Sequence, residues 1–562
     1  MKEPWDHTYD VVVVGSGAAG MAAALTARLR GLTALVVEKT DRYGGSTALS
    51  GGGVWIPDNL HHAAAGLGDT PEQARAYLDA TVGDRVPAER KDAYLAQGPA
   101  MLREFHDKTD VRFVYVPDYS DYYPERPGGL PQGRSIEPEM FDLKRLGPAQ
   151  RSGLRRAGLP TYGLTITTRD FRHLNMVGRT WKGRRTSLKV GLRAVKNLAT
   201  GKRMLSLGEA LVARMRYSLE RLGGDLWLSA PVTGLVTEGE RITGVRIDRN
   251  GEEIAVRATG GVVLASGGFS HNRELREKHL PSPTSTAWSA AAEGQTGDGL
   301  ELAVEAGAAT DLMDKVWGGP MVVAPGAKPF FLVADRGIPG MVIVNQAGER
   351  FTNEACPYHE FVDAMYANDL PDASTVPSWL ILDAAAKSRY MITGLFPGQP
   401  FPKAWTDSGF VKKADTLDEL AVRTELPVAR LRATIERFNG FARAGRDEDF
   451  HRGDSAYDRY YGDPTLTNPN LAPLEKGPFY AVPLQPGDIG TKGGPVTDAT
   501  ARVLREDGTP IDGLYASGNV SAAVMGETYP GPGATIGPAM TFSWIAVNHI
   551  AGARDATGAR EA

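Results

Sequence analysis

The chain has 562 residues, enough for about two or three domains, and its 42% hydrophobic and 23% charged residues are ordinary values for a globular protein. The formal net charge of -4 excludes a general attraction to nucleic acid or to anionic membrane. The single cysteine, Cys356, excludes an internal disulfide and a thiolate metal cluster, and no metal site is predicted.

The N-terminal residues lack the apolar region of a signal peptide, and no apolar run in the chain is long enough to span a bilayer. We therefore expect a cytoplasmic protein without a transmembrane segment.

The first residues predict a nucleotide-binding unit. Residues 9–15 (YDVVVVG), 16–31 (SGAAGMAAALTARLRG) and 32–39 (LTALVVEK) are expected to form a strand, a helix after a glycine-rich turn, and a second strand. The unbroken valine run is typical of a parallel strand that is covered on both faces.

The glycine-rich turn matches the dinucleotide motif GxGxxG after a strand and before a helix. Its glycines permit a tight turn, a close approach of pyrophosphate to the backbone and close helix packing, and the helix N-terminus offers free N–H groups to phosphate. An acid about twenty residues further on is placed to accept ribose hydroxyls. The predicted contacts of this unit are Gly15, Ser16, Gly17, Ala18, Ala19, Gly20, Glu38 and Lys39.

The motif alone does not distinguish NAD from FAD, but two later features favour FAD. A Gly/Ser loop follows the acid closely and is able to wrap a second phosphate and one side of the flavin ring, while later strand ends and the last helix approach from the other side. The predicted contacts are Gly44, Gly45, Ser46, Thr47, Ser50, Gly51, Gly52 and Gly53 in the loop, and Ala265, Gly267, Gly518, Asn519, Gly533 and Ile536 further on.

Three strand-to-glycine turns lie far apart in the chain. Buried strands are predicted at 261–265 and 513–516, and a last helix at about 537–551, in addition to the N-terminal unit. We expect an α/β protein in which a Rossmann-like FAD-binding domain, residues 1–284 and 479–562, contains an inserted α+β catalytic domain, residues 285–478.

Residues 151–203 form a locally basic insertion in which Asp170 is the single acid. Basic residues mixed with apolar ones at 188–198 suggest a peripheral membrane contact at the inner face of the cell membrane, whereas the alternative is a solvated basic helix. Nucleic acid binding is not expected. The basic residues are Arg151, Arg155, Arg156, Arg169, Arg172, Arg179, Lys182, Arg184, Arg185, Lys189, Arg193, Lys196, Lys202 and Arg203.

Residues 529–533 (YPGPG) combine one phenol with a backbone fixed by proline and glycine. A tyrosine hydroxyl and a glycine amide are able to donate together to a carbonyl oxygen that becomes enolate-like. The alternative is a plain turn, because Pro and Gly at these spacings form turns in any case.

Together these motifs resemble the bacterial 3-ketosteroid Δ1-dehydrogenases, members of the fumarate-reductase-like flavoproteins. The resemblance covers residues 8–550 and includes the fingerprint, the GGST loop, TGDG at 296–299, NEACPY at 353–358, DYYPE at 121–125 and YPGPG. It implies non-covalent FAD, with Asp298 as a further contact, and a steroid A ring between the two domains. An electron acceptor such as a quinone is also implied.

The resemblance further implies a role for each residue of the reaction. Tyr358 would remove the C2 proton, Tyr529 and the Gly533 amide would polarise the C3 carbonyl, and flavin N5 would accept the C1 hydride. Tyr122 matches a supporting tyrosine, although Tyr119 and Tyr123 leave the register open. A tyrosine base predicts an alkaline optimum, because the reference pKa of a phenol is about 10.

Three alternatives remain open at the level of sequence. Δ4-(5α)-dehydrogenation of a 3-ketosteroid is the same chemistry at different carbons, and a fumarate-reductase-like enzyme of small acids would need Arg and His groups that clamp carboxylates. A membrane-docked electron carrier without its own substrate is the third. The flavin loop holds no histidine for covalent attachment, and His61 and His62 are expected at the surface.

Overall fold

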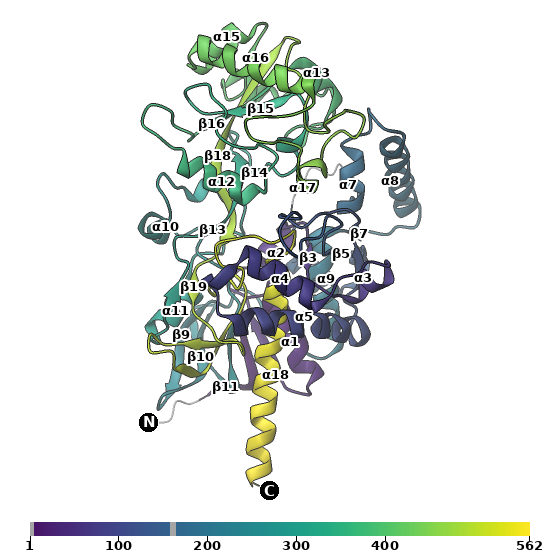
Figure 1. Cartoon of the computed structure of the whole chain (residues 1–562). Coiled ribbons are helices and arrows are strands. Elements are labelled where there is room, and N and C mark those ends of the chain that lie inside the picture. The colour runs from purple at the N-terminus through teal and green to yellow at the C-terminus, as the bar shows by residue number, and fades with distance from the viewer. Residues whose placement is uncertain (1–4, 158–163, 562) are drawn as a thin grey trace.

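The computed structural model describes residues 5–157 and 164–561, which form two regions, each built around a sheet (Figure 1). The first sheet has the order β20-β21-β11-β1-β2-β8, with β10 paired to β11 and β9 to β10. Its strands are β1 (His7–Val14), β2 (Ala34–Val37), β8 (Asp225–Trp227), β9 (Val232–Glu238), β10 (Arg241–Arg249), β11 (Glu252–Leu264), β20 (Arg502–Leu504) and β21 (Pro510–Ala516).

The parallel centre of this sheet joins the two ends of the chain. β1 pairs in parallel with β2 and β11, and β11 pairs in parallel with β21. Val11 and Val13 belong to one buried cluster, and Val12 and Val14 to another, so both faces of β1 are covered. This explains the unbroken valine run and confirms the predicted α/β fold.

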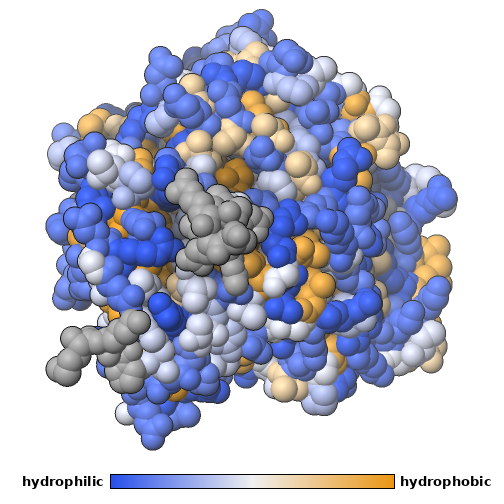
Figure 2. Space-filling view, turned by 90° about the horizontal axis from the view of Figure 1, so that it is seen from below, coloured by the Kyte–Doolittle hydropathy of each residue, from blue (hydrophilic) through white to orange (hydrophobic). Residues whose placement is uncertain are grey.

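Helices cover the face of the sheet that carries Val11 and Val13. α1 (Ala18–Leu29) packs against α18 (Ile536–Glu561) and α9 (Leu207–Arg221), and α18 packs against α5 (Ala88–Lys108). α18 ends in a projection from the lower end of the molecule (Figure 1). Figure 2 shows this end, where hydrophilic residues cover most of the surface and hydrophobic residues form small groups.

The second sheet has the order β14-β13-β18-β16-β15, with β17 paired to β18. Helix α12 (Tyr358–Ala367) packs on β13, while α15 (Leu417–Thr424) and α16 (Val428–Ala444) lie at the outer end (Figure 1). Its strands are β13 (Val316–Val322), β14 (Phe330–Phe331), β15 (Met341–Val344), β16 (Ser378–Leu382), β17 (Lys412–Ala414) and β18 (Phe479–Thr491).

The long strand β18 follows the predicted domain boundary at residue 478 but lies in the second sheet, where it pairs with β13, β16 and β17. The strand pairing therefore extends the second sheet to residue 491 of the chain. The division into 1–284, 285–478 and 479–562 stays a prediction.

Smaller elements surround the two sheets. Those of the first half are α2 (Gly45–Leu49), β3 (Val54–Trp55), α3 (Leu60–Ala64), α4 (Pro71–Thr81), β4 (Phe113–Tyr115), β5 (Ser135–Pro138), β6 (Phe141–Asp142), α6 (Pro148–Gly153), α7 (Thr168–Leu174), α8 (Trp181–Ala199), β7 (Met204–Leu205) and α10 (Arg273–His279). Those of the second half are α11 (Asp298–Glu305), β12 (Thr310–Asp311), α13 (Ala384–Arg389), α14 (Lys403–Asp407), α17 (Ala456–Arg459) and β19 (Gly494–Pro495).

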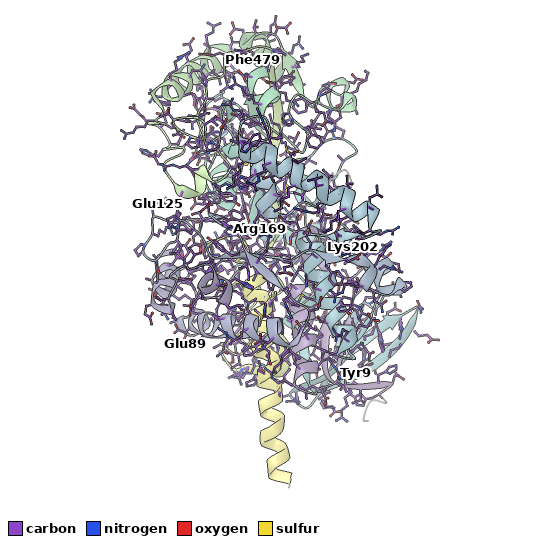
Figure 3. The ribbon with its side chains drawn as sticks, turned by 90° about the vertical axis from the view of Figure 1, so that its right-hand side faces the viewer. Tyr9, Glu89, Glu125, Arg169, Lys202 and Phe479 are labelled. Carbon is purple, nitrogen blue, oxygen red and sulfur yellow. The ribbon has the colours of Figure 1, made fainter. Side chains whose placement is uncertain are left out.

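The basic insertion forms helices α7 and α8 on the outside of the molecule, and residues 158–163 within it lie outside the described residues (Figures 1 and 3). Acids from other parts of the chain pair with several of its arginines, in addition to the predicted Asp170. Arg156 pairs with Glu209, Arg169 with Glu137, Arg172 with Asp118 and Arg179 with Asp463.

A buried ion-pair network holds the loop that precedes β5. Arg134 is fully buried and pairs with Asp69 and Asp121, and Asp121 also accepts a hydrogen bond of 2.8 Å from the Trp55 indole. Removing one partner would leave an uncompensated buried charge, so the network fixes this loop and its Tyr122 in place.

None of the helices in the described part of the chain has the length and apolar character needed to cross a membrane. The expectation that His61 and His62 lie at the surface is wrong. His62 is buried and His61 half-buried, because their short helix packs its rings against Tyr115 and His106. Burial lowers the pKa of each histidine to about 4.

Candidate active site

A cavity of about 1260 Å³ runs from the glycine-rich turn after β1 to a group of tyrosines beside the second sheet. Its first part is lined by the turn, by the loop after β2 and by the ends of β11 and β21. This is the edge where the carboxyl ends of parallel strands meet, the usual ligand site of such sheets.

The glycines of the motif and of the loop after β2 fit a cofactor for two different reasons. A side chain on Gly20 would meet the carbonyl oxygen of Gly15 at 1.8 Å, and one on Gly15 would meet that of Ala265 at 2.4 Å. Around Gly17 and Gly51, in contrast, no described protein atom lies closer than 3.6 Å to the position of an added Cβ atom. Gly17 and Gly51 therefore leave space that faces the cavity, as a bound pyrophosphate requires.

Glu38 lies at the end of β2, where its carboxylate is held by protein groups. It accepts hydrogen bonds from the Ser16 hydroxyl at 2.5 Å and from the Thr40 backbone and hydroxyl at 3.0 and 2.8 Å. Lys39 forms an ion pair of 2.7 Å with Asp298, so the two predicted contacts neutralise each other at the cavity wall.

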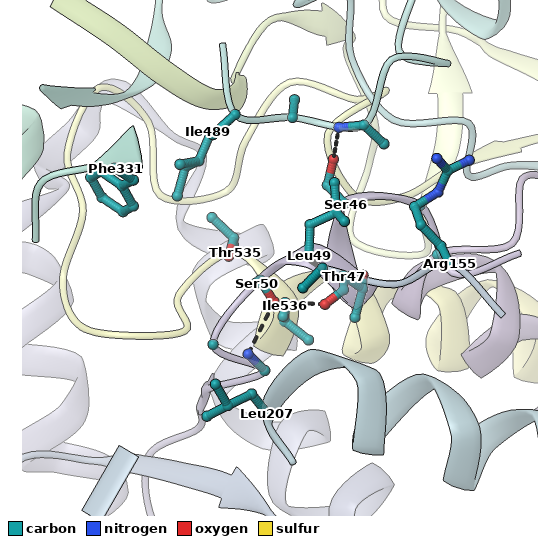
Figure 4. A pocket seen from close by; sticks show the side chains of 18 of the residues that line it. Ser46, Thr47, Leu49, Ser50, Arg155, Leu207, Phe331, Ile489, Thr535 and Ile536 are labelled. Atoms are coloured by element: carbon teal, nitrogen blue, oxygen red, sulfur yellow. Dashed lines mark hydrogen bonds between the residues drawn. The ribbon is translucent and has the colours of Figure 1, made fainter. Parts of the chain in front are cut away.

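The loop after β2 is fixed by its own hydroxyls (Figure 4). Ser46 accepts a hydrogen bond of 2.8 Å from the Ala292 backbone, Thr47 accepts one of 3.0 Å from Ala18 at the start of α1, and Ser50 accepts one of 3.0 Å from Gly52. The loop thereby stays attached to the glycine-rich turn.

Most predicted contacts line this cavity, and two do not. Gly20 and Gly44 lie behind it, where Gly20 packs against the turn and Gly44 donates a hydrogen bond of 3.0 Å to the Ser16 hydroxyl. The residues that line it are Gly15, Ser16, Gly17, Ala18, Ala19, Glu38, Lys39, Gly45, Ser46, Thr47, Ser50, Gly51, Gly52, Gly53, Ala265, Gly267, Asp298, Gly518, Asn519, Gly533, Ile536, Tyr122, Tyr358 and Tyr529.

Three tyrosines from distant parts of the chain meet in the same cavity. The ring centre of Tyr358 lies 5.5 Å from that of Tyr529 and 5.5 Å from that of Tyr122, and Tyr122 and Tyr529 are 5.1 Å apart. Tyr122 donates its backbone N–H to the Pro530 carbonyl at 2.9 Å. The geometry therefore places Tyr122, rather than Tyr119 or Tyr123, against the other two rings.

Burial dominates the pKa of each phenol in this cluster. It raises the pKa of Tyr358 well above the usual value, and the neighbouring Tyr529 and Tyr119 raise it further. The pKa of Tyr529 is also raised by burial, although hydrogen bonds with Tyr358, Thr535 and the Gly533 backbone act in the opposite direction. The Gly533 backbone therefore lies beside the Tyr529 hydroxyl.

The structure also shows which residues surround the three tyrosines. Tyr123 and His359 share a hydrogen bond of 2.8 Å, and burial lowers the pKa of His359 well below its usual value, so the ring is neutral. Trp317 packs on Tyr529 with the ring centres 4.7 Å apart, and Phe331 packs on Tyr358 with the ring centres 4.9 Å apart. No spacing signal links these residues, although His359 is adjacent to Tyr358 in the sequence.

The matching family model is the FAD binding domain, over residues 10–536. The 3-oxosteroid 1-dehydrogenase of Mycolicibacterium smegmatis is 49% identical over 553 residues, which cover 97% of each chain. The chain belongs to the 3-ketosteroid Δ1-dehydrogenase family. It is an FAD-dependent oxidoreductase, and the histidine-free loop at residues 43–53 is consistent with non-covalent FAD.

Two further relatives are similar to the chain over nearly its full length. The structure of the 3-ketosteroid Δ1-dehydrogenase of Sterolibacterium denitrificans, in complex with 1,4-androstadiene-3,17-dione, is 41% identical with a TM-score of 0.93, and covers 97% of this chain and 100% of its own. A 4-oxocyclohexanecarboxylate 2-dehydrogenase of Sinomonas cyclohexanicum is 36% identical over 561 residues, which cover 97% of this chain and 93% of its own.

We expect Gly20→Ala to purify with little or no flavin, because the added methyl group has no space between α1 and the turn. The flavin absorbance per polypeptide measures this directly. Gly440→Ala in helix α16 is the matched control, since nothing lies within 4 Å of its added Cβ atom and alanine favours a helix. Full flavin content in Gly20→Ala would contradict the assigned packing.

Proposed function

We propose that the protein catalyses the FAD-dependent 1,2-dehydrogenation of 3-ketosteroids. The observation that carries this proposal is the meeting of Tyr358 and Tyr529, with the Gly533 amide, in the cavity that the flavin contacts also line. The activities named for its relatives support the same reaction.

The C3 carbonyl would be held by the Tyr529 hydroxyl and the Gly533 amide. A C–H bond next to a ketone becomes acidic only when the developing enolate is stabilised, and two fixed donors in a site without bulk water do this. Since burial keeps the Tyr529 hydroxyl protonated, this phenol remains a donor throughout the neutral range.

Tyr358 would remove the C2 proton. It stands at the first residue of α12, and its ring faces Tyr122 and Tyr529 edge to face. Tyr122 would support it, because its buried ring lies edge to face against that of Tyr358, with the ring centres 5.5 Å apart. When bound, FAD supplies the acceptor of the C1 hydride at its N5 atom.

The walls of the cavity beside the tyrosines favour a steroid over a dicarboxylic acid. Phe331, Val333 and Ile489 line the cavity there, and Trp317 packs against the Tyr529 ring. The buried Arg336 is no carboxylate clamp, because its guanidinium donates to the carbonyls of Leu332, Glu354 and Cys356. Δ4-(5α)-dehydrogenation remains the alternative, as it needs the same groups with the ring presented differently.

We expect Tyr358→Phe and Tyr529→Phe each to retain FAD but to lose flavin reduction by about 10²-fold or more, because each removes one catalytic hydroxyl. Anaerobic mixing with 4-androstene-3,17-dione, followed by flavin bleaching and product analysis, measures the loss. Tyr515→Phe is the control, since that hydroxyl is bonded to His549 instead.

The product decides between the two regiochemistries. A 1,4-diene from the unaltered protein supports the proposal. Bleaching only with a 5α-saturated 3-ketosteroid would replace it with Δ4-(5α)-dehydrogenation, and bleached enzyme that is reoxidised by fumarate would favour the small-acid alternative.

We expect the rate constant of flavin reduction to rise from neutral to alkaline pH, because the phenolate fraction of Tyr358 grows about tenfold per pH unit below its raised pKa. The tyrosines and the histidine that face it do not change charge over this range, whereas burial lowers the pKa of Lys492, which contacts Trp317, to about 7. The pKa values of Tyr122, Tyr119 and Tyr529 are raised by burial, and that of His359 is lowered. Stopped-flow traces that show an equal rate at mildly acidic pH would refute the tyrosine base.

We also propose that helix α8 contacts the cell membrane. A quinone in that membrane would collect the electrons from the reduced flavin. Trp181, Leu188, Leu192 and Val195 recur at helical spacing and are each more than half exposed, as is Leu198 beside them. Val190 is buried on the opposite side and lines the cavity, so one helix separates the substrate space from the apolar face.

Charge around this face indicates an anionic bilayer as its partner. No ion pair to a described residue is formed by the exposed side chains of Lys182, Arg184, Arg185, Lys189 and Lys196, whereas Arg193 is paired inward with Asp170. Apolar side chains between free cations are typical of helices that lie in the headgroup region. Figure 3 views the molecule from the side that carries α8.

We expect the protein to co-sediment with vesicles that contain about one-third phosphatidylglycerol, and the triple variant Leu188→Ser, Leu192→Ser, Val195→Ser to lose this binding, because these residues supply the apolar contact. The exposed Val422, replaced by Ser on α15, is the control. Equal binding of the triple variant and the unaltered protein would leave α8 as a solvated basic helix.

A further inference from the structure

We propose that Lys492 is a positioning residue for the reaction, which sets the place of the Tyr529 hydroxyl from behind the site. This inference rests on the proposed dehydrogenation. Lys492 follows the last residue of β18, and its side chain is buried beneath the segment that leads into Tyr529.

The backbone of Lys492 is fixed on both sides. Its N–H donates to the Lys315 carbonyl at 2.9 Å, and its carbonyl accepts from the Ala523 N–H at 3.0 Å. The residue is 1% exposed, so its position is set by the junction of the second sheet with the loop that carries YPGPG.

The ammonium group is hydrogen-bonded to the backbone of the two residues that precede Tyr529. It donates to the carbonyl oxygens of Glu527 at 2.7 Å and Thr528 at 2.8 Å, and it lies 4.5 Å from the centre of the Trp317 ring. No carboxylate lies within 4 Å of it in the described part of the chain, and burial lowers its pKa to about 7, although the charges of Asp363 and Glu527 favour its protonated form. Burying an amine without a directly bonded anion is costly, so the arrangement is better explained by orientation than by stability.

Trp317 connects the Lys492 ammonium to the site. Its ring contacts both the ammonium and Tyr529, with its centre 4.7 Å from that of the phenol. Its indole N–H donates to the Asn519 side chain at 3.1 Å, and Asn519 lines the flavin part of the cavity. Lys492 therefore restrains Tyr529 along two routes, through the backbone that precedes it and through the Trp317 ring.

The same loop has a separate, outer anchor that serves as a comparison. The carboxylate of Glu527 interacts with Arg85 at 3.2 Å and with Lys315 at 3.4 Å, and all three side chains are partly exposed. Exposed ion pairs contribute little, whereas a displacement of a reacting group by about 1 Å costs about 10²-fold in rate.

The test measures the two half-reactions of Lys492→Met, which keeps the length of the side chain and removes the ammonium. We expect flavin reduction by 4-androstene-3,17-dione to slow by about tenfold to 10²-fold, with substrate affinity and flavin content near those of the unaltered protein. Reoxidation by an added quinone should be unchanged, and Lys492→Arg should restore part of the rate. Lys315→Met is the control and should stay within about twofold.

Each outcome decides the inference. An unaltered reduction rate in Lys492→Met overturns it, and an equal slowing of both half-reactions shows a general structural role instead. If Lys492→Met does not fold with FAD, Trp317→Leu removes the intermediate ring while Lys492 stays, and an unaltered rate there overturns the inference. If the unaltered protein is not reduced by any 3-ketosteroid, the proposed function fails, and the inference with it.

Discussion

The close backbone packing of Gly53 against Gly533 is the constraint on which the site depends. A side chain on Gly533 would meet the carbonyl group of Gly53 at 2.5 Å, and its φ of +99° suits glycine. The contact is closed by a hydrogen bond of 3.2 Å from the Trp55 N–H to the Gly533 carbonyl. Because the loop after β2 and the YPGPG segment touch here, Tyr529 is held close to the predicted flavin contacts without any long side chain to bridge the two.

The second sheet brings the remaining group to this boundary. β18 and β13 run as an antiparallel pair whose lower end reaches the FAD-binding region, with Val316 opposite Thr491. Helix α12 lies on β13 and begins at Tyr358, so the phenol is held by a helix start rather than by a flexible loop. Reacting groups on rigid elements keep their geometry through a catalytic cycle, and here three different parts of the chain supply one group each.

Local motifs could be predicted from sequence, whereas their spatial partners could not. The strand, turn and helix around Gly15 and the acid Glu38 follow from short-range rules, because all of their determinants lie within one βαβ unit. The choice of Tyr122 among neighbouring tyrosines depends on contacts with Tyr358 and Tyr529, and His62 is buried by packing that no periodicity reveals. The sequence also does not reveal that β18, which follows residue 478, pairs within the second sheet, because a strand's sheet is decided by pairing with residues distant in sequence.

Burial raises the pKa of both phenols, which favours the proposed role of Tyr529 and opposes that of Tyr358. A low-dielectric site keeps Tyr529 protonated and strengthens its hydrogen bond to a developing enolate, but it also opposes the phenolate form of Tyr358. The two demands are compatible when negative charge moves from the base to the C3 oxygen during proton transfer. The rings are 5.5 Å apart, so the charge travels a short distance between groups that are both already desolvated. A more polar site would make the phenolate of Tyr358 easier to form and the enolate harder to stabilise. The apolar side chains of Phe331 and Trp317 favour stabilisation of the enolate.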